Sequence, residues 1–399
     1  MIPGSWKCRN DEPRRGANVS GSLLAGALSF ALIVLASRLH PTSYNNYVLL
    51  ADAFLHGRVW IDWPGAYIDA LAYAGKHYVI EAPLPAFLLV PAVALWGTAA
   101  NQSLLAALLG GVAVGSGWDI ARRLGVALPA RTWLCAFLLF GTDLFWCAMY
   151  GDVWFIAHVA AAAFTLLALG ELLGAKRPWL IALYAGCAVE SRFSLLLAVP
   201  VYALWLWFES APPERIRRIA SFAGALVPFA AFWLWYNEAR WGQLGDIGYT
   251  TWYHQDQVGE TTGSPFRLEY VPNQLYSFFV RFPDIVAQAP YLTPTYNGVA
   301  LTWTSPALLL ALFARGPRPA VLALWCATLL VFLPNVTYYV NGFAQFGMRH
   351  ALDFEPFLFV LMLIAARDRW NWIWTTLCAW SVFAGAWGVW YWKTFYRPL

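Results

Sequence analysis

Residues 179–209 read WLIALYAGCAVESRFSLLLAVPVYALWLWFE, two short apolar segments joined by the charged triplet Glu190-Ser191-Arg192. An ionisable group at or near hydrocarbon depth costs several kcal/mol unless it faces a partner or a water-filled cavity. Short or broken helices are tolerated inside a membrane bundle where they line such a cavity. The stretch therefore predicts a helical membrane protein in which the tip at residues 190–192 faces a cavity.

The composition of the whole chain agrees with this prediction. The 399 residues are 60% hydrophobic and 12% charged, the mean hydropathy is +0.52, and apolar segments of membrane-spanning length recur along nearly the entire chain. A water-soluble core of this size does not require such segments. The predicted fold class is an all-α polytopic membrane protein.

Aromatic residues, charge and cysteines narrow the function classes. The 24 Trp and 19 Tyr cluster near the segment ends, which is typical of membrane anchors; a stacking platform for sugars or nucleic acid is the alternative. The net charge is only +4, without a basic run beyond residues 215–218, so no nucleic acid partner is predicted. The six cysteines, Cys8 among them, lack CxxC or Cys/His spacing, so neither a disulfide framework nor a zinc site is expected.

The basic clusters define a topology under the positive-inside rule. The clusters placed on the cytoplasmic side are Arg14-Arg15, Arg122-Arg123-Arg131, Lys176-Arg177, Arg215-Arg217-Arg218, Arg315-Arg318 and Arg367-Arg369. The expected spans are 19–37, 101–120, 132–148, 154–174, the short pair 179–190 and 194–209, then 219–237, 298–314, 319–335, 351–366 and 371–389. This gives about eleven helices, with the amino terminus inside and the carboxyl terminus outside.

The remaining segments complete a single transmembrane domain over residues 1–399. Residues 1–18 form a polar cytoplasmic tail, and the long run to Leu39 without a clear cleavage motif favours a retained signal anchor over a cleaved signal peptide. The apolar but Pro-interrupted residues 83–98 are expected to insert only partly. The outer loops 38–82 and 238–297 are long, but each is shorter than a usual domain.

The first outer loop is rich in carboxylates: Asp52, Asp62, Asp69 and Glu81 lie within about thirty residues. Apolar residues at helical spacing from Tyr47 to Leu55 predict a helix lying in the membrane interface. The loop carboxylates are candidates for a general base, and the alternative is a solvated loop whose charges have no role.

Asp152 and His158 lie six residues apart near the predicted outer surface, in the stretch GTDLFWCAMYGDVWFIAHV. The alternative for Asp152 is an amino-terminal helix cap. The alternative for His158 is a core histidine with its hydrogen bonds satisfied.

Two arginines near the outer surface need anionic partners. Glu190 is two residues from Arg192, and Asp353 follows Arg349 and His350 at the start of a late span, so each arginine has a candidate neutralising carboxylate nearby in the chain. Guanidinium forks also bind phosphate in a bidentate manner. A lipid-linked phosphate at headgroup level is therefore a candidate ligand.

No GxGxxG, P-loop, GxSxG or HExxH motif occurs in a suitable context, so nucleotide cofactors and the corresponding hydrolytic reactions are not expected.

The chain resembles the GT-C superfamily of integral membrane glycosyltransferases, especially the protein O-mannosyltransferases and lipid A aminoarabinose transferases. The matching stretches are Tyr47, Leu50–Gly57, Gly75–Tyr78, Ala82-Pro83-Leu84, Asp152, Gly186–Arg192 and Arg349–Pro356. The position of the family's catalytic Asp falls near Ser43–Asn46, and Glu81 stands where the family has a lysine. The resemblance implies a polyprenyl-phosphate sugar donor and a metal-independent site.

The resulting hypothesis is a membrane glycosyltransferase whose site faces outward from the plasma membrane. The donor phosphate lies near Arg192 and Arg349, and Asp52 or Asp69, with Asp152 as the next candidate, is the general base. Further site candidates are Asp62, Glu81, His158, Glu190 and His350. No cofactor or metal is expected; the partners are membrane lipids, the lipid-linked donor, and a glycan, lipid or protein acceptor. The alternative functions are a transporter or flippase for a lipid-linked or polar substrate, and a ligase that uses a diphosphate-linked donor.

Overall fold

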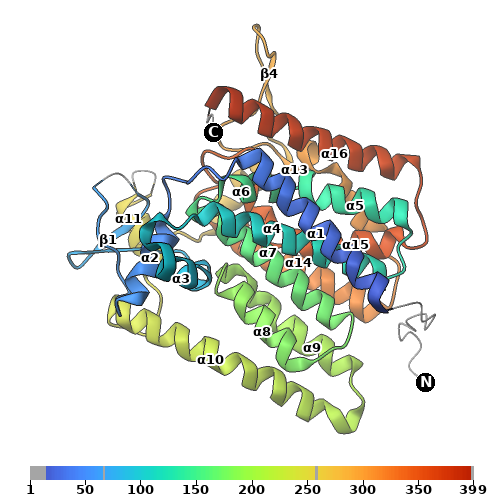
Figure 1. The fold of residues 1–399 in the computed structure, drawn as a ribbon, viewed down its shortest axis with the longest axis horizontal. Coiled ribbons are helices and arrows are strands. Elements are labelled where there is room, and N and C mark those ends of the chain that lie inside the picture. Colours follow the sequence, from blue (N-terminus) through green and yellow to red (C-terminus); the bar gives the residue numbers. More distant parts are fainter. Residues whose placement is uncertain (1–14, 66–67, 257–258, 397–399) are drawn as a thin grey trace.

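The computed structural model describes residues 15–65, 68–256 and 259–396, and the fold is a helical bundle with small outer elements at one end (Figure 1). Cys8, Arg14 and most of the predicted tail lie outside the described residues. The longest helices are α1 (Arg15–Ser37), α4 (Gln102–Arg123), α7 (Val153–Leu172), α10 (Arg215–Trp241), α14 (Arg318–Thr337) and α16 (Trp372–Tyr391). The protein is an all-α polytopic membrane protein, as predicted.

Several spans are broken or short. Helices α5 (Leu128–Phe140) and α6 (Leu144–Tyr150) meet at a bend of 47°. Helix α8 (Pro178–Val189) is followed by the 3-10 helix η2 (Phe193–Ala198) and α9 (Val199–Glu209), and η6 (Arg349–Asp353) leads into α15 (Glu355–Ala366). Among the described residues, five helices are individually long and apolar enough to cross a membrane, or six with the bent pair counted as one span.

The predicted span 298–314 is not one α-helix. The structure has the short α13 (Leu301–Thr304) and then the 3-10 helix η5 (Pro306–Phe313). Pro306 lacks an N–H donor and disfavours helical backbone at the residue before it, which explains the break at Ser305. The other predicted spans each coincide with helical structure.

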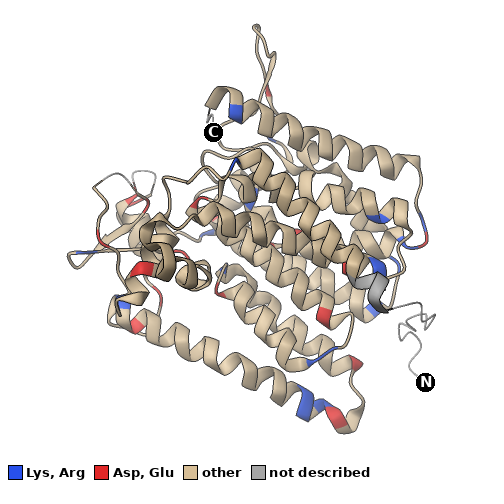
Figure 2. Ribbon diagram, in the orientation of Figure 1, with Lys and Arg blue, Asp and Glu red and all other residues tan. Residues whose placement is uncertain are grey.

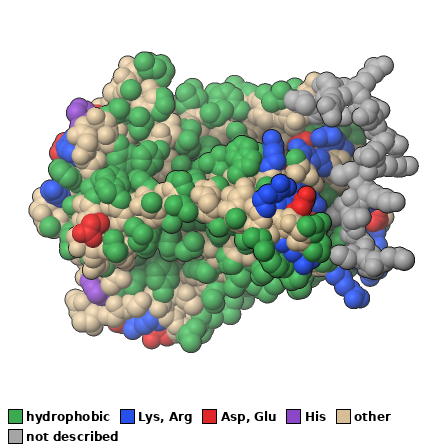
Figure 3. Space-filling view, turned by 90° about the horizontal axis from the view of Figure 1, so that it is seen from below, with side chains coloured by type: hydrophobic (Ala, Val, Ile, Leu, Met, Phe, Trp, Pro, Cys, Tyr) green, Lys and Arg blue, Asp and Glu red, His purple; other side chains and the backbone are tan. Residues whose placement is uncertain are grey.

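The surface of the bundle is apolar in its middle part and charged toward its ends, as expected for a protein in a bilayer. Figure 3 shows a broad apolar band with charged side chains toward its two ends, and Figure 2 shows Lys and Arg mainly near helix ends. Three of the predicted cytoplasmic clusters lie at one end of the bundle: Arg123 donates to the Gly170 carbonyl at 3.2 Å, close to the cluster at Lys176, and Arg218 donates to the Lys176 carbonyl at 2.6 Å. The membrane sidedness of that end remains a prediction.

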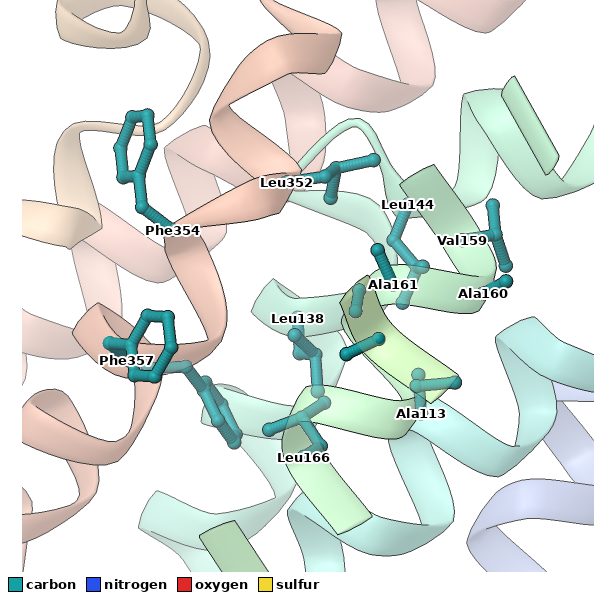
Figure 4. Packing of buried hydrophobic residues seen from close by; sticks show 14 of the residues in the cluster. Ala113, Leu138, Leu144, Val159, Ala160, Ala161, Leu166, Leu352, Phe354 and Phe357 are labelled. Atoms are coloured by element: carbon teal, nitrogen blue, oxygen red, sulfur yellow. The ribbon is translucent and has the colours of Figure 1, made fainter. Parts of the chain in front are cut away.

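Helix α7 lies at the centre of the bundle and is almost entirely buried, with α4 and α8 packed against it. Figure 4 shows its small side chains Ala160 and Ala161 in the same packed cluster as Leu138 and Leu352 from other segments. Alanines allow neighbouring helices to approach closely where lipid supplies no hydrophobic drive for association. This packing holds the outer ends of α7, α8 and η6 together.

The first loop folds against the outer end of the bundle. It contains α2 (Asn46–Leu55), the hairpin β1 (Leu71–Tyr73) and β2 (Lys76–Tyr78), and then α3 (Leu84–Trp96), which is followed by η1 (Gly97–Ala99). The predicted interfacial helix coincides with α2. The ring of Tyr78 packs against Trp241 at the end of α10, 5.0 Å away, and buried Tyr47 donates to the Ala82 carbonyl at 3.1 Å.

The second long loop follows α10 and contains short elements only. Its elements are α11 (Gly248–Gln255), η4 (Leu268–Tyr270), α12 (Val271–Phe279), and a hairpin of β3 (Asp284–Ile285) and β4 (Leu292–Thr293). The 3-10 helix η3 (Pro212–Glu214) lies before α10 and is not part of this loop. The π-helix η7 (Trp392–Tyr396) ends the described chain. Tyr249 on α11 extends from this loop toward the tip after α8, where it lines a cleft.

Candidate active site

A polar cleft lies between the first loop, the tip after α8 and the outer end of α10. Its lining residues are Ile80, Glu81, Ala82, Pro83, Val189, Glu190, Ser191, Arg192, Phe193, Trp233, Tyr236, Arg240, Asp246 and Tyr249. A second cavity, between α5–α6 and α16, has no charged residue among those that line it and offers Thr142 as its only side-chain hydroxyl. The first cleft is therefore the candidate site for polar chemistry.

The tip at Glu190-Ser191-Arg192 faces this cleft, as predicted. Helix α8 ends there because Arg192 is in an extended conformation, while its amide still bonds to the Ala188 carbonyl at 2.9 Å. The Leu84 amide donates to the Glu190 carbonyl at 2.9 Å, which joins the tip to the start of α3. The bond fixes the tip against the first loop.

Arg192 is held from behind by Asp353. Its Nη2 lies 3.2 Å from Asp353 Oδ2 and its Nε lies 3.3 Å from each carboxylate oxygen. Asp353 pairs with Arg192 because η6 brings it across to the tip. The alternative pairings, Arg192 with Glu190 and Arg349 with Asp353, are therefore not formed among the described residues. Among the described residues, no acceptor bonds to Arg192 Nη1, so this end of the guanidinium is available to a ligand.

The Asp353 carboxylate is held in turn by two other side chains. His158 Nδ1 lies 2.7 Å from Asp353 Oδ1, and Ser194 Oγ donates to Oδ2 at 2.7 Å. His350 Nδ1 lies 3.4 Å from Arg192 Nη2, and its ring centre lies 5.2 Å from that of His158. Both histidines are buried. His158 therefore serves this polar network rather than an apolar core.

Glu81 lies in the cleft wall with its side chain almost fully enclosed. It is 6% exposed, and its Oε2 has no hydrogen-bond partner. Burial and the nearby Asp69 raise the pKa of Glu81 to about 8, whereas Arg192 and Arg349 act in the opposite direction. The carboxylate form of such a group is a stronger base than an ordinary glutamate, and it becomes populated as the pH rises toward 8.

Asp69 stands beside Glu81 in a fixed position. Its Oδ2 accepts a hydrogen bond from the Trp154 indole at 2.8 Å, and its carbonyl accepts one from Asn46 Nδ2 at 2.6 Å. These bonds join the first loop to the starts of α7 and α2. Of the predicted site residues, Glu81, Glu190 and Arg192 line the cleft. Asp69 acts electrostatically on Glu81, and His158 and His350 belong to the network around Asp353 and Arg192.

Arg349 occupies a separate, buried position. It donates to the Phe343 carbonyl at 3.1 Å and to Gln345 Oε1 at 3.0 Å, and no carboxylate oxygen of the described chain lies within 4.0 Å of it. Two further buried carboxylates, Asp143 and Glu355, have unpartnered oxygens, and neither was predicted as a site residue. Asp143 interacts electrostatically with both Arg349 and Glu355.

The other predicted carboxylates lie outside the cleft. Asp52 and Asp62 flank Arg58 at 3.9 and 2.6 Å on the surface of the first loop, where the Asp62 side chain is 77% exposed. Asp152 is fully buried at the start of α7, where its carboxylate accepts a hydrogen bond from Thr42 rather than capping the helix with its side chain.

The opposite wall comes from α10 and the second loop. Arg240 Nη2 bonds to Asn237 Oδ1 at 2.8 Å and lies 3.9 Å from Asp246. Burial raises the pKa of Tyr249 to about 12, with Arg192 and Glu81 acting in opposite directions. Neither Arg240 nor Tyr249 was among the site residues predicted from the sequence. A basic residue in the last turn of a span was the available signal for Arg240.

No metal-binding cluster is evident in the described part of the chain: it contains no group of three or more His, Cys, Asp or Glu side chains arranged to hold an ion. The groups that line the cleft are suited to proton transfer and to binding a phosphate.

The fold matches two crystal structures of ArnT from Cupriavidus metallidurans, one bound to undecaprenyl phosphate and one in the apo state. The TM-scores are 0.54 and 0.53, with 16% sequence identity and coverage of 88% and 89% of this chain. This chain spans 61% of the length of each ArnT chain. The fold is therefore GT-C-like, as predicted. Neither protein-family models nor curated proteins match the sequence.

Proposed function

We propose that the chain is a membrane glycosyltransferase that moves a sugar from a polyprenyl-phosphate donor to an acceptor hydroxyl. The observation that carries this proposal is the pairing, across one cleft, of an oriented arginine with a buried carboxylate of raised pKa. The fold adds support, since one ArnT structure with this fold holds undecaprenyl phosphate. The cleft faces the outer side of the plasma membrane in the predicted topology.

Arg192 binds the donor phosphate in this proposal. Asp353 engages Nε and Nη2, so Nη1 points its remaining donors to a phosphate oxygen. As the bond between the anomeric carbon and the phosphate oxygen breaks, the leaving phosphate gains negative charge. A preorganised guanidinium stabilises that charge more strongly in the transition state than in the ground state. Arg349 contributes a longer-range positive potential rather than a direct contact.

Glu81 is the general base in this proposal. Its carboxylate accepts the proton of the acceptor hydroxyl while the hydroxyl oxygen bonds to the anomeric carbon, and the electron pair of the broken bond leaves with the phosphate. Asp69 keeps the pKa of Glu81 high by its neighbouring charge. Asp52 and Asp152, which lie away from the cleft lining, have no direct part in this step.

The test is donor turnover by the purified protein in lipid nanodiscs. Radiolabelled polyprenyl-phosphate hexoses and pentoses are supplied with a membrane extract as the acceptor source, and label leaving the donor is followed. We expect turnover by the wild type, strong loss in Arg192→Ala and Glu81→Gln, and full activity in the matched surface control Asp62→Asn. Equal turnover by wild type and both cleft variants would contradict the proposal.

A transporter for a lipid-linked or polar substrate is the second candidate, because Asp143 and Glu355 are buried with unpartnered oxygens. Buried carboxylates at membrane depth often mark ion or substrate pathways. Saturable substrate movement into liposomes without any covalent product, alongside intact donor lipids, would favour this function over sugar transfer.

A further inference from the structure

The hairpin of β3 and β4 projects away from the helical bundle (Figure 1). Asp284 pairs with Thr293 and Ile285 with Leu292, and the Val286 amide donates to the Tyr291 carbonyl at 3.0 Å near the turn. Figure 1 shows the hairpin projecting beyond α16, across the direction of that helix rather than along it. The hairpin therefore extends roughly perpendicular to the axis of α16 and away from the bundle.

The hairpin exposes several large apolar side chains. Ile285 is 87% exposed, Tyr291 is 62% exposed, and Phe282 at the base is 54% exposed. Asp284 is the single charged residue between positions 282 and 296. Loops that are fully solvated rarely expose several large apolar side chains together, so the hairpin surface indicates an apolar environment.

The base of the hairpin lies in a layer of aromatic rings at the end of α16. Tyr296 contacts the rings of Trp392 and Tyr396, at centroid distances of 5.5 and 5.8 Å. Neighbouring Trp390 and Phe395 are each about half exposed toward the surroundings. Tryptophan and tyrosine favour the headgroup level of a bilayer, which places the base of the hairpin at that depth.

We propose that this hairpin is a lateral anchor that lies in the interfacial layer of the outer leaflet, with lipid as its occupant. Its apolar side chains enter the boundary between headgroups and acyl chains, where a surface-lying element with one charge is stable. Each strand pairs only with the other, so the outer strand edges still need polar partners. Headgroups and interfacial water supply them, whereas the hydrocarbon core does not.

The proposal concerns the membrane surface and does not depend on sugar transfer. It predicts that the hairpin stays at the depth of the aromatic rings at the end of α16, because both its base and its tip contact the interface. The competing occupants are a second copy of the chain and a soluble partner. The environment of the hairpin tip distinguishes lipid from either of them.

The experiment places a spin label at the hairpin in nanodiscs that each hold one copy of the full chain. The labelled variants are Ile285→Cys and Tyr291→Cys, and the matched control is Gln243→Cys, an exposed polar position in the same outer loop. The described cysteines are buried or half-buried, and the wild type is labelled in parallel to subtract their signal together with that of Cys8. Accessibility to dissolved oxygen is compared with accessibility to a water-soluble nickel chelate.

We expect oxygen to relax the labels at 285 and 291 several-fold more effectively than the nickel chelate does, with the opposite preference at 243. Nickel-dominated relaxation at both hairpin positions would overturn the proposal, because it would place the tip in water. Dipolar broadening that appears only in discs loaded with two copies, with loss of the oxygen preference in single-copy discs, would also overturn it by identifying a second copy as the occupant.

Discussion

Arg192 owes its orientation to Asp353, which lies 161 positions away in the sequence, and not to Glu190 two residues before it. His158 and Ser194 complete the bonds to the same carboxylate. Removing one partner of a buried ion pair leaves an uncompensated charge, which is more damaging than the net strength of the pair suggests. Asp353 is thus a positioning residue for Arg192 in the proposed reaction.

Substitution of Asp353 tests this positioning. Asp353→Asn keeps the side-chain volume but loses the charge that orients Arg192, and we expect kcat/KM to fall on the order of 100-fold, because a small misplacement of a catalytic group has that effect. Ser194→Ala removes one hydrogen bond, worth about 1 kcal/mol, and is expected to reduce kcat/KM about fivefold. Steady-state donor turnover, with folding checked by thermal unfolding, measures both. A folded Asp353→Asn protein with wild-type kcat/KM would contradict this role.

The raised pKa of Glu81 predicts a pH dependence. Its pKa of about 8 exceeds the usual value of 4.5, so the carboxyl group is mostly protonated at pH 7 and its base form grows as pH rises through 8. If Glu81 is the base, kcat/KM rises about tenfold per pH unit below pH 8 and levels off above it. The same shift means that the free energy of unfolding decreases as the pH rises from 4.5 to 8, because the folded state favours the protonated, neutral form of Glu81.

A pH profile of kcat/KM for wild type and two variants provides the measurement. Glu81→Gln should remove the rising limb together with most of the activity. Asp69→Asn should move the limb to lower pH, because it removes a neighbouring negative charge that raises the pKa of Glu81. A limb that is unchanged in Asp69→Asn would show that another group titrates.

Helix positions could be predicted well from sequence, but only some of their breaks could: the break at residues 190–192 was predicted, and the bend between α5 and α6 was not. Spans such as α4, α7 and α14 are set by local apolar length, and they appear within a few residues of their predicted bounds. The bend between α5 and α6 depends on how Gly141 and Asp143 pack against neighbours distant in sequence. The partners of Arg192 were missed for the same reason, since η6 and the α8 tip meet only in the folded bundle.

Close contact between α5 and α16 supplies a prediction at the level of helix packing. A Cβ atom on Gly385 would lie 1.8 Å from the Phe140 carbonyl oxygen, so Gly385→Ala forces the helices apart. We expect a loss of about 1–3 kcal/mol, typical of overpacking. The matched control is Gly224→Ala on α10, where the added Cβ would meet nothing within 4 Å and helix propensity favours Ala by about 1 kcal/mol.

Thermal unfolding in the same detergent measures these two alanine variants. We expect a lower Tm for Gly385→Ala and an unchanged or higher Tm for Gly224→Ala. Equal Tm values for the two variants would show that α5 and α16 separate without a measurable energetic cost.

Over the whole molecule, composition and aromatic placement were sufficient to predict a polytopic membrane protein, and the order of weak motifs was sufficient to predict the GT-C-like fold. The site was predicted only in part. Arg192 and Glu190 could be identified as residues of the cleft because charges in apolar segments are conspicuous. The choice of Glu81 over Asp52 follows from burial and from proximity to Arg192, both of which depend on how the first loop folds onto α10.

In the proposed function, Arg192 holds a lipid-linked phosphate in the cleft. The most direct measurement compares the binding of undecaprenyl phosphate with that of uncharged undecaprenol to the purified protein in nanodiscs. We expect wild type and Arg122→Ala, a control at the opposite end of the bundle, both to prefer the phosphate at least tenfold, and Arg192→Ala to lose this preference. Equal affinities of the two lipids for the wild type, or an undiminished preference in Arg192→Ala, would contradict the proposed function.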